Sequence, residues 1–219
     1  MDHLRRYLRD APVCATFVLA CAAVFCVEVL QSRSLGDPVG VPGAGSGAAW
    51  ALMVVAPEIT GEHQWWRLAT SALVHMSITH LLLNMLLVAL VGRELEKAYG
   101  AAVTAVSVLL CAVGGSLAAL WFSPDQAVGG ASTVGYGMFA MLVGLAVSRG
   151  QDVRAPLVLI AVNLAYTVTS PGVSLAGHLG GLAAGGVIAL VLLARKKARN
   201  TARRKRGTTS TPWSSEDRR

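Results

Sequence analysis

The sequence predicts an all-α polytopic membrane protein built from six transmembrane helices, and three observations support this fold class. Hydrophobic residues make up 54% of the 219-residue chain, the mean hydropathy is +0.55, and only 14% of residues are charged. Six apolar runs approach the roughly 17 to 25 residues that a membrane-spanning helix needs. The basic residues also lie almost entirely in every second one of the segments that flank and connect these runs. A soluble globular domain is therefore excluded.

The six runs are placed by hydropathy alone. They are Pro12 to Leu30, about Ser77 to Val91, Ala101 to Phe122, Ser132 to Val147, Ala155 to Thr169 and Val173 to Ala194. Two of them are short, at about 15 residues, and can cross a bilayer only if the helix continues into flanking residues or the bilayer thins. We expect residues 11–194 to form one membrane domain.

The charge distribution predicts the orientation. With both termini in the cytoplasm, 17 of the 19 Lys and Arg residues lie in cytoplasmic segments, and the outer loops keep only Arg33 and Arg67. This strong asymmetry follows the positive-inside rule. We therefore expect a multi-pass protein of the cell membrane with both termini cytoplasmic.

Residues 1–10 form a short basic amphipathic segment, expected to lie at the cytoplasmic surface. The first apolar run could instead belong to a secretory signal peptide, but its roughly 19 residues exceed the usual 7 to 15, which favours an uncleaved anchor. The cysteines at positions 14, 21, 26 and 111 all fall in apolar runs, so we interpret them as packing residues and infer neither a disulfide nor a metal site.

A long outer loop, about residues 31–70, follows the first run and carries Trp50, Trp65 and Trp66. These rings suggest that the loop rests partly in the membrane interface. Arg67 directly follows Trp66, and the simplest interpretation of this pair is an interfacial anchor with a cation–π contact.

The second run carries His80 and Asn84, four residues apart and so on one helix face. His75 precedes them and belongs to the turn before the helix. An interhelical hydrogen bond would explain the pair without any catalytic role. A metal site made of His75, His80 and His178 matches no compact ligand motif. The following sequence GRELEKAYG predicts a cytoplasmic turn held by local ion pairs, with Gly100 ending the helix.

Ser132 begins the fourth run, directly after a glycine-rich turn that includes Gly130. It could simply cap the helix. Alternatively, the free N–H groups of a helix start suit a developing negative charge, which places a serine there near both a nucleophile and an oxyanion site. Tyr136 lies one turn further along the same face.

The sixth run carries glycines at every fourth position, Gly177, Gly181 and Gly185, and such a stripe lets another helix pack closely. His178 borders the stripe. We expect the Ser132 helix to pack there, with Tyr136 in contact with His178. In the fifth run, Asn163 is interpreted as a helix–helix hydrogen-bonding residue.

A serine hydroxyl becomes a useful nucleophile when a base takes its proton, and histidine is the commonest base. Ser132 and His178 can supply that pair. Since the later runs contain no Asp or Glu, a catalytic site here would be a dyad.

In this order, the motifs resemble those of the rhomboid family of intramembrane serine proteases, from about Trp66 to Gly186. The matching elements are Trp66-Arg67, the H-x4-H-x3-N pattern of residues 75 to 84, the E-K-x-x-G turn of residues 96 to 100, the G-x-S element with Tyr136, and the small-His-x-x-Gly element at residues 177 to 181.

The resemblance implies a six-helix rhomboid-like bundle and a role for each matching residue. Ser132 would be the nucleophile and His178 the general base, with Tyr136 packed against it. Asn84 and His80 would form the oxyanion hole with the Ser132 backbone N–H, and the supporting residues would be His75, Arg67, Gly130 and Gly181. The site would open to the outer face, and the substrates would be transmembrane helices that enter sideways. Thr133 stands where the family usually has a second glycine and could narrow the oxyanion pocket.

The leading hypothesis is a serine endopeptidase that cleaves transmembrane helices, with no cofactor, metal or ATP. A non-catalytic rhomboid-like protein that binds transmembrane helices is the alternative. A transporter or channel would require polar groups along a pathway and a repeat between halves, which the sequence lacks. Residues 195–219 form a basic tail, expected to be disordered and attracted to anionic lipid rather than nucleic acid.

Overall fold

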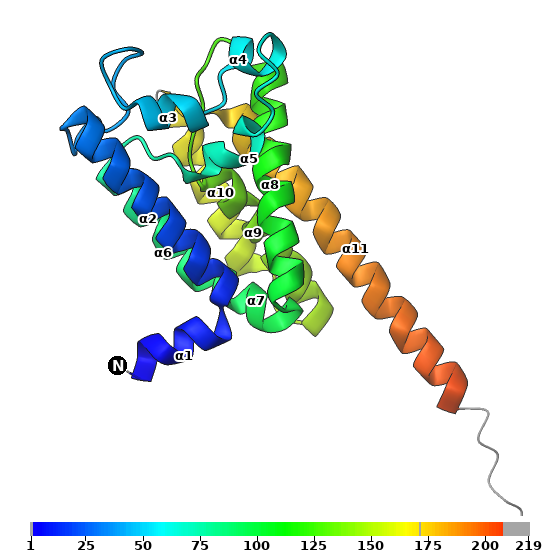
Figure 1. The fold of residues 1–219 in the computed structure, drawn as a ribbon. Coiled ribbons are helices and arrows are strands. Elements are labelled where there is room, and N and C mark those ends of the chain that lie inside the picture. The colour runs from blue at the N-terminus through cyan, green and yellow to red at the C-terminus, as the bar shows by residue number, and fades with distance from the viewer. Residues whose placement is uncertain (1, 171, 208–219) are drawn as a thin grey trace, which may run out of the picture.

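The structure is a computed structural model that describes residues 2–170 and 172–207, and it is built from helices (Figure 1). Six long helical segments coincide with the six predicted runs. They are α2 (Pro12–Ser32), α6 (Ile78–Leu87) continued by the π-helical turn η2 (Val88–Gly92) and α7 (Arg93–Tyr99), α8 (Ala101–Phe122), α9 (Ser132–Arg149), α10 (Arg154–Thr169) and α11 (Leu175–Gly207). A short helix, α1 (Asp2–Asp10), precedes them.

Four of these segments are long and apolar enough to cross a membrane: α2, the continuous segment from α6 to α7, α8, and α11. The α10 helix is apolar but shorter. The chain is therefore a helical membrane protein. A count of six crossing helices and their direction remain predictions.

The α9 helix lies at the centre of the bundle, with α8, α10 and α11 against it (Figure 1). Eleven of its 18 residues are buried. Small residues permit this close packing: a Cβ added to Gly185 of α11 would lie 2.1 Å from the Gly137 carbonyl oxygen of α9, and one added to Gly144 would lie 2.6 Å from the Ala189 Cβ. Backbone approach at glycines is the usual way in which membrane helices associate.

At the end of the bundle that carries α1, Glu96 of α7 holds the start of α2. Its carboxylate oxygens accept the backbone N–H groups of Val13 at 2.9 Å and Cys14 at 3.0 Å. These are first-turn amides with no acceptor in their own helix. The prediction that local ion pairs hold this turn was therefore incomplete, because Glu96 reaches a helix more than 80 residues away. Gly100, with φ of +84°, ends α7 as predicted.

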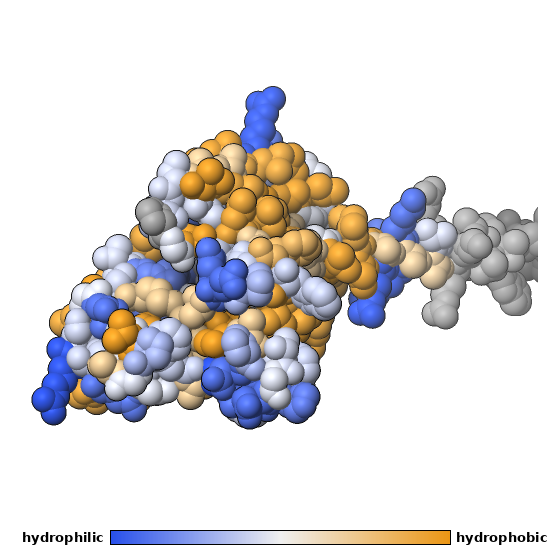
Figure 2. Space-filling model, turned by 90° about the horizontal axis from the view of Figure 1, so that it is seen from above, coloured by the Kyte–Doolittle hydropathy of each residue, from blue (hydrophilic) through white to orange (hydrophobic). Residues whose placement is uncertain are grey.

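The long loop at the opposite end contains three short helices, α3 (Gly47–Leu52), α4 (Ala56–Thr60) and α5 (Arg67–Thr70), followed by the 3-10 turn η1 (Ser71–Leu73). An isolated antiparallel bridge between Val54 and Val128 ties the loop to the segment before α9. Seen from this end, hydrophilic residues gather over the loop while hydrophobic residues border it (Figure 2). The loop thus helps to fix the chain that leads into Ser132.

The basic tail departs from the expected disorder. The α11 helix continues without a break through Gly207 and projects away from the bundle (Figure 1). The segment from Arg195 is rich in Ala, Arg and Lys, which are strong helix formers, so a helix that has already started continues through it. Residues 208–219 lie outside the described part of the chain.

Candidate active site

Ser132 and His178 are in direct contact. The Ser132 Oγ lies 2.8 Å from the His178 Nε2, although the two residues are separated by 46 positions. Ala131 is the N-cap of α9 and Ser132 is the first residue of the helix, and the Ser132 hydroxyl bonds to His178 rather than to a backbone N–H of the first turn. The N-cap interpretation was therefore wrong. His178 is only 7% exposed, whereas Ser132 is partly exposed, so the imidazole is shielded from bulk water and the hydroxyl remains accessible.

The glycine stripe of α11 brings the two residues together, as predicted. A Cβ added to Gly181 would lie 2.1 Å from the Thr133 carbonyl oxygen, so only glycine allows this approach of α11 to α9. Tyr136 stacks on the His178 imidazole with the ring centroids 4.3 Å apart and the planes inclined by 22°. The predicted contact between Tyr136 and His178 is confirmed.

A third residue, Thr167 of α10, completes the arrangement and was not predicted. Its Oγ1 lies 2.8 Å from the His178 Nδ1 and 2.8 Å from the Tyr136 hydroxyl. A threonine in an apolar run carries no sequence signal of its own. The available clue was indirect: no carboxylate occurs in the later runs, so an uncharged polar group was needed to satisfy the second imidazole nitrogen.

His80 lies close to Ser132. A Cβ added to Gly130 would lie 2.8 Å from the His80 Cε1, 3.1 Å from its Nε2 and 3.5 Å from the Ser132 Oγ, so His80 and Ser132 border the same point. Gly130 has φ of +141° and donates its N–H to the Ser71 carbonyl. The His80 Nδ1 accepts the Met76 N–H at 3.3 Å. A neutral His80 therefore carries its proton on Nε2, on the side of Gly130.

Asn84 lies one turn below His80, and its amide donates to the His80 carbonyl at 2.9 Å. Asn163 behaves in the same way and donates to Leu159 of its own helix at 2.8 Å. The helix–helix hydrogen bond predicted for Asn163 was wrong, and the one considered as an alternative for Asn84 is not formed either, because each amide donates to the carbonyl four residues back in its own helix. Among the described residues, no side-chain hydrogen bond joins Asn84 to Ser132.

The His75 imidazole packs against the His80 imidazole. The two rings lie 5.1 Å apart, and the His75 Nδ1 bonds to the Leu73 carbonyl at 3.1 Å. Burial, reinforced by the neighbouring His80, lowers the pKa of His75 to about 3. Its backbone N–H points to the carboxylate of Glu28 on α2, at 3.4 Å. His178 is not part of this group, and the described residues contain no cluster of three His, Cys, Asp or Glu side chains able to hold a metal ion.

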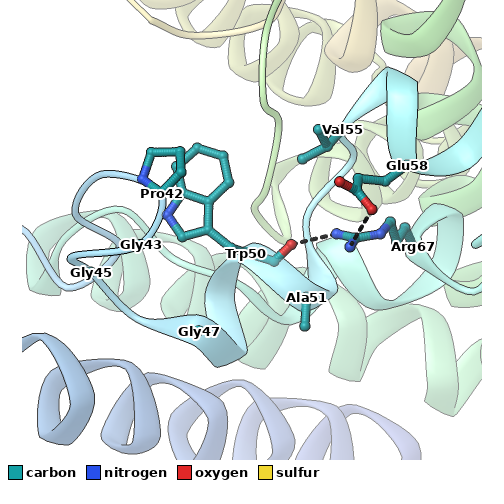
Figure 3. Close-up of a pocket in the computed structure, with 9 residues that line it drawn as sticks. All are labelled: Pro42, Gly43, Gly45, Gly47, Trp50, Ala51, Val55, Glu58 and Arg67. Carbon is teal, nitrogen blue, oxygen red and sulfur yellow. Dashed lines mark hydrogen bonds and ion pairs between the residues drawn. The ribbon is translucent and has the colours of Figure 1, made fainter. Parts of the chain in front are cut away.

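Arg67 lies in the long loop, where it lines a cavity of about 450 Å³ with Trp50 and Glu58 (Figure 3). Its guanidinium donates to the carbonyls of Trp50 and, at 3.1 Å, Met53. The pairing with Glu58 is looser, at 3.7 Å. The expected cation–π contact with Trp66 was wrong, because buried carbonyls of the loop attract the charge more strongly than an exposed ring. Arg67 thus supports the loop rather than the dyad.

The Thr133 side chain is buried against α8 and α11. Its Cβ and Cγ2 are the nearest atoms to Gly115 of α8, each 2.6 Å from a Cβ built there, and its Cγ2 also approaches Gly177 of α11. The side chain therefore fills space between α8 and α11. Because residue 115 has no side chain, α8 can lie close to α9 even though residue 133 is a threonine rather than a glycine.

Comparison with known proteins identifies the family to which this chain belongs. The Rhomboid domain family matches residues 62–195, more than half of the chain. Similar proteins include Rhomboid protease GluP of Bacillus subtilis (strain 168), 31% identical over 90 residues, which are 41% of this chain and 18% of that protein. Rhomboid-like protease 3 of Toxoplasma gondii is 35% identical over 75 residues, 34% of this chain and 28% of that protein. RHOMBOID-like protein 2 of Arabidopsis thaliana is 33% identical over 81 residues, 37% of this chain and 26% of that protein.

These alignments therefore cover less than a third of each relative's length. The family match is broader, and its residue range contains every residue of the predicted site. The chain belongs to the rhomboid family.

Proposed function

We propose that this protein is an intramembrane serine endopeptidase that cleaves transmembrane-helix substrates with Ser132 as nucleophile and His178 as general base. The observation that carries the proposal is the 2.8 Å contact between the Ser132 Oγ and the His178 Nε2, with Tyr136 stacked on the imidazole. The domain would cross the membrane six times with both termini cytoplasmic, and the site would open near the outer face.

The geometry supports a two-step acyl transfer. As the Ser132 Oγ attacks the scissile carbonyl carbon, the His178 Nε2 accepts the hydroxyl proton and then delivers it to the leaving amine. A water molecule, deprotonated by the same nitrogen, then hydrolyses the acyl-enzyme ester and regenerates the serine. Each step moves one proton through His178, and neither requires a metal or cofactor.

The oxyanion would be held by donors that already surround Ser132. The Ser132 backbone N–H belongs to the first helical turn and has no acceptor within α9, and the His80 Nε2–H borders the same point. The Asn84 amide now donates to the His80 carbonyl. If the side chain rotated, the amide could donate to the oxyanion instead. Fixed donors of this kind are usually the largest single source of transition-state stabilisation in acyl transfer.

The alternative function is helix binding without catalysis, and Thr133 was the reason to consider it. Its side chain packs between α8 and α11, so its presence does not favour the inactive protein. The family match leaves both functions open, and a direct test is required.

The test is cleavage in reconstituted liposomes. The substrates would be single transmembrane helices with small residues near their outer end. Wild type and Ser148→Ala should cleave, whereas Ser132→Ala and His178→Ala should not. Ser148 is the matched control, because it lies on the same helix and its hydroxyl bonds only to Leu145 of α9. Retained binding of these helices with no cleavage by wild type would support the alternative instead.

A further inference from the structure

Thr167 is the centre of a hydrogen-bond network that has no counterpart in a simple two-residue site. Its Oγ1 contacts three polar groups: the His178 Nδ1 at 2.8 Å, the Tyr136 hydroxyl at 2.8 Å and the carbonyl of Asn163 at 2.9 Å. We infer that Thr167 is a positioning residue that holds the proton of neutral His178 on Nδ1, so that Nε2 is free to act as the base. This inference rests on the proposed function of the dyad.

A count of hydrogens leads to this assignment. A threonine hydroxyl has one hydrogen to donate and two lone pairs to accept. The Asn163 carbonyl can only accept, so the Thr167 hydrogen points to it, and the other two contacts must then be donated to Thr167. The donors are the Tyr136 hydroxyl and the His178 Nδ1–H. With Nδ1 protonated, Nε2 of the neutral ring has a free lone pair for the Ser132 hydroxyl.

The opposite tautomer satisfies the same groups less well. If Thr167 donated to Nδ1, its hydrogen bond to Asn163 would be lost and the Nε2 of His178 would carry the proton. Ser132 would then face a donor and could not lose its own proton to it. Thr167 therefore takes the tautomer-fixing role that a carboxylate plays in a three-residue site.

The location of Thr167 indicates that its burial serves this contact. Only two residues of α10 are buried, Pro156 at its start and Thr167 near its end. Thr167 is 3% exposed, while Thr169, two residues further along, is exposed and bonds to the Ala165 carbonyl of its own helix. An apolar side chain would fill this buried site equally well, so the hydroxyl calls for an explanation of its own.

The size of the effect follows from the charge. A neutral hydroxyl can orient the imidazole but cannot neutralise it after protonation, so its loss should cost less than the roughly 10⁴-fold that follows loss of a carboxylate. We expect Thr167→Val, which keeps the shape and removes the hydroxyl, to lower the rate of fluorophosphonate labelling by about 10-fold to 100-fold. Thr167→Ser should recover the wild-type rate to within about threefold. Thr169→Val makes the same chemical change on the same helix and should leave the rate unchanged.

A second measurement reports the tautomer without activity. Nitrogen-15 NMR of histidine-labelled protein in lipid distinguishes a protonated from an unprotonated ring nitrogen, and His178→Ala identifies the signals. Wild type, Thr167→Ser and Thr169→Val should show Nε2 unprotonated in the neutral ring, and Thr167→Val should show mixed tautomers. If Thr167→Val kept both the wild-type tautomer of His178 and the wild-type rate of fluorophosphonate labelling, the inference would be overturned. An unlabelled wild type with the expected tautomer would instead contradict only the proposed function.

Discussion

Gly181→Ala tests most sharply how helix packing sets the geometry of the proposed active site. A Cβ at position 181 would lie 2.1 Å from the carbonyl oxygen of Thr133, 2.8 Å from its carbonyl carbon and 3.0 Å from its Cα. All three are backbone atoms of α9 and cannot rotate away. Since ordinary contact begins near 3.4 Å, α11 would have to retreat by about 1.3 Å.

The retreat would act directly on the dyad, because His178 lies three residues before Gly181 on the same helix. If it is transmitted to the imidazole, the 2.8 Å contact between His178 and Ser132 passes beyond hydrogen-bonding range. A displacement of about 1 Å at a catalytic pair can cost about 100-fold in rate. The added methyl should also destabilise the fold by about 1–3 kcal/mol through overpacking.

The assay is cleavage of a reconstituted transmembrane substrate, with thermal unfolding in detergent as the check on folding. Gly186→Ala is the matched control, since a Cβ at that position of α11 meets nothing within 4 Å. Gly181→Ala should lose about 100-fold in kcat/KM while remaining folded, and Gly186→Ala should match wild type. Equal activity in the two folded variants would refute the argument that backbone contact at Gly181 sets the geometry of the dyad.

Three further predictions follow from the described contacts. Thr133→Gly should leave labelling no faster than wild type while lowering the unfolding temperature, because the side chain fills space beside Gly115 rather than the oxyanion side; faster labelling would contradict this. Glu96→Ala should destabilise the protein by about 2 kcal/mol, measured against Glu94→Ala, because two amides of α2 lose their acceptor. Because burial lowers the pKa of His75 to about 3, the unfolded chain binds more protons below about pH 6.5, so stability should fall from pH 6.5 towards pH 3. Folded His75→Gln should show a shallower decline in unfolding temperature, and an identical decline would show that other groups cause it.

Much of the fold was predictable because the bilayer imposes simple rules on sequence. Apolar length places the six long helical segments, since every backbone group in lipid must be satisfied within a helix. The four-residue spacing of Gly177, Gly181 and Gly185 predicts a close helix contact. The same spacing places His178 beside that contact, so its meeting with Tyr136 and Ser132 could be foreseen.

Other features depend on contacts that no local pattern encodes. Thr167 resembles any polar residue in an apolar helix until α10 is placed beside His178. Glu96 resembles a member of a charged turn until the start of α2 is brought to it. Arg67 follows an exposed tryptophan in sequence, yet its guanidinium donates to backbone carbonyls 14 and 17 residues away. In each case, a buried donor or acceptor found its partner through tertiary structure.

The central claim, that His178 activates Ser132, is tested most directly by mass spectrometry of the purified protein after treatment with a fluorophosphonate. We expect a covalent adduct on Ser132 in wild type, and no adduct there in His178→Ala although the serine is still present. Ser148 should remain unmodified in both proteins. A folded wild type without the adduct, or an adduct on Ser132 that forms equally fast without His178, would show that His178 does not activate Ser132.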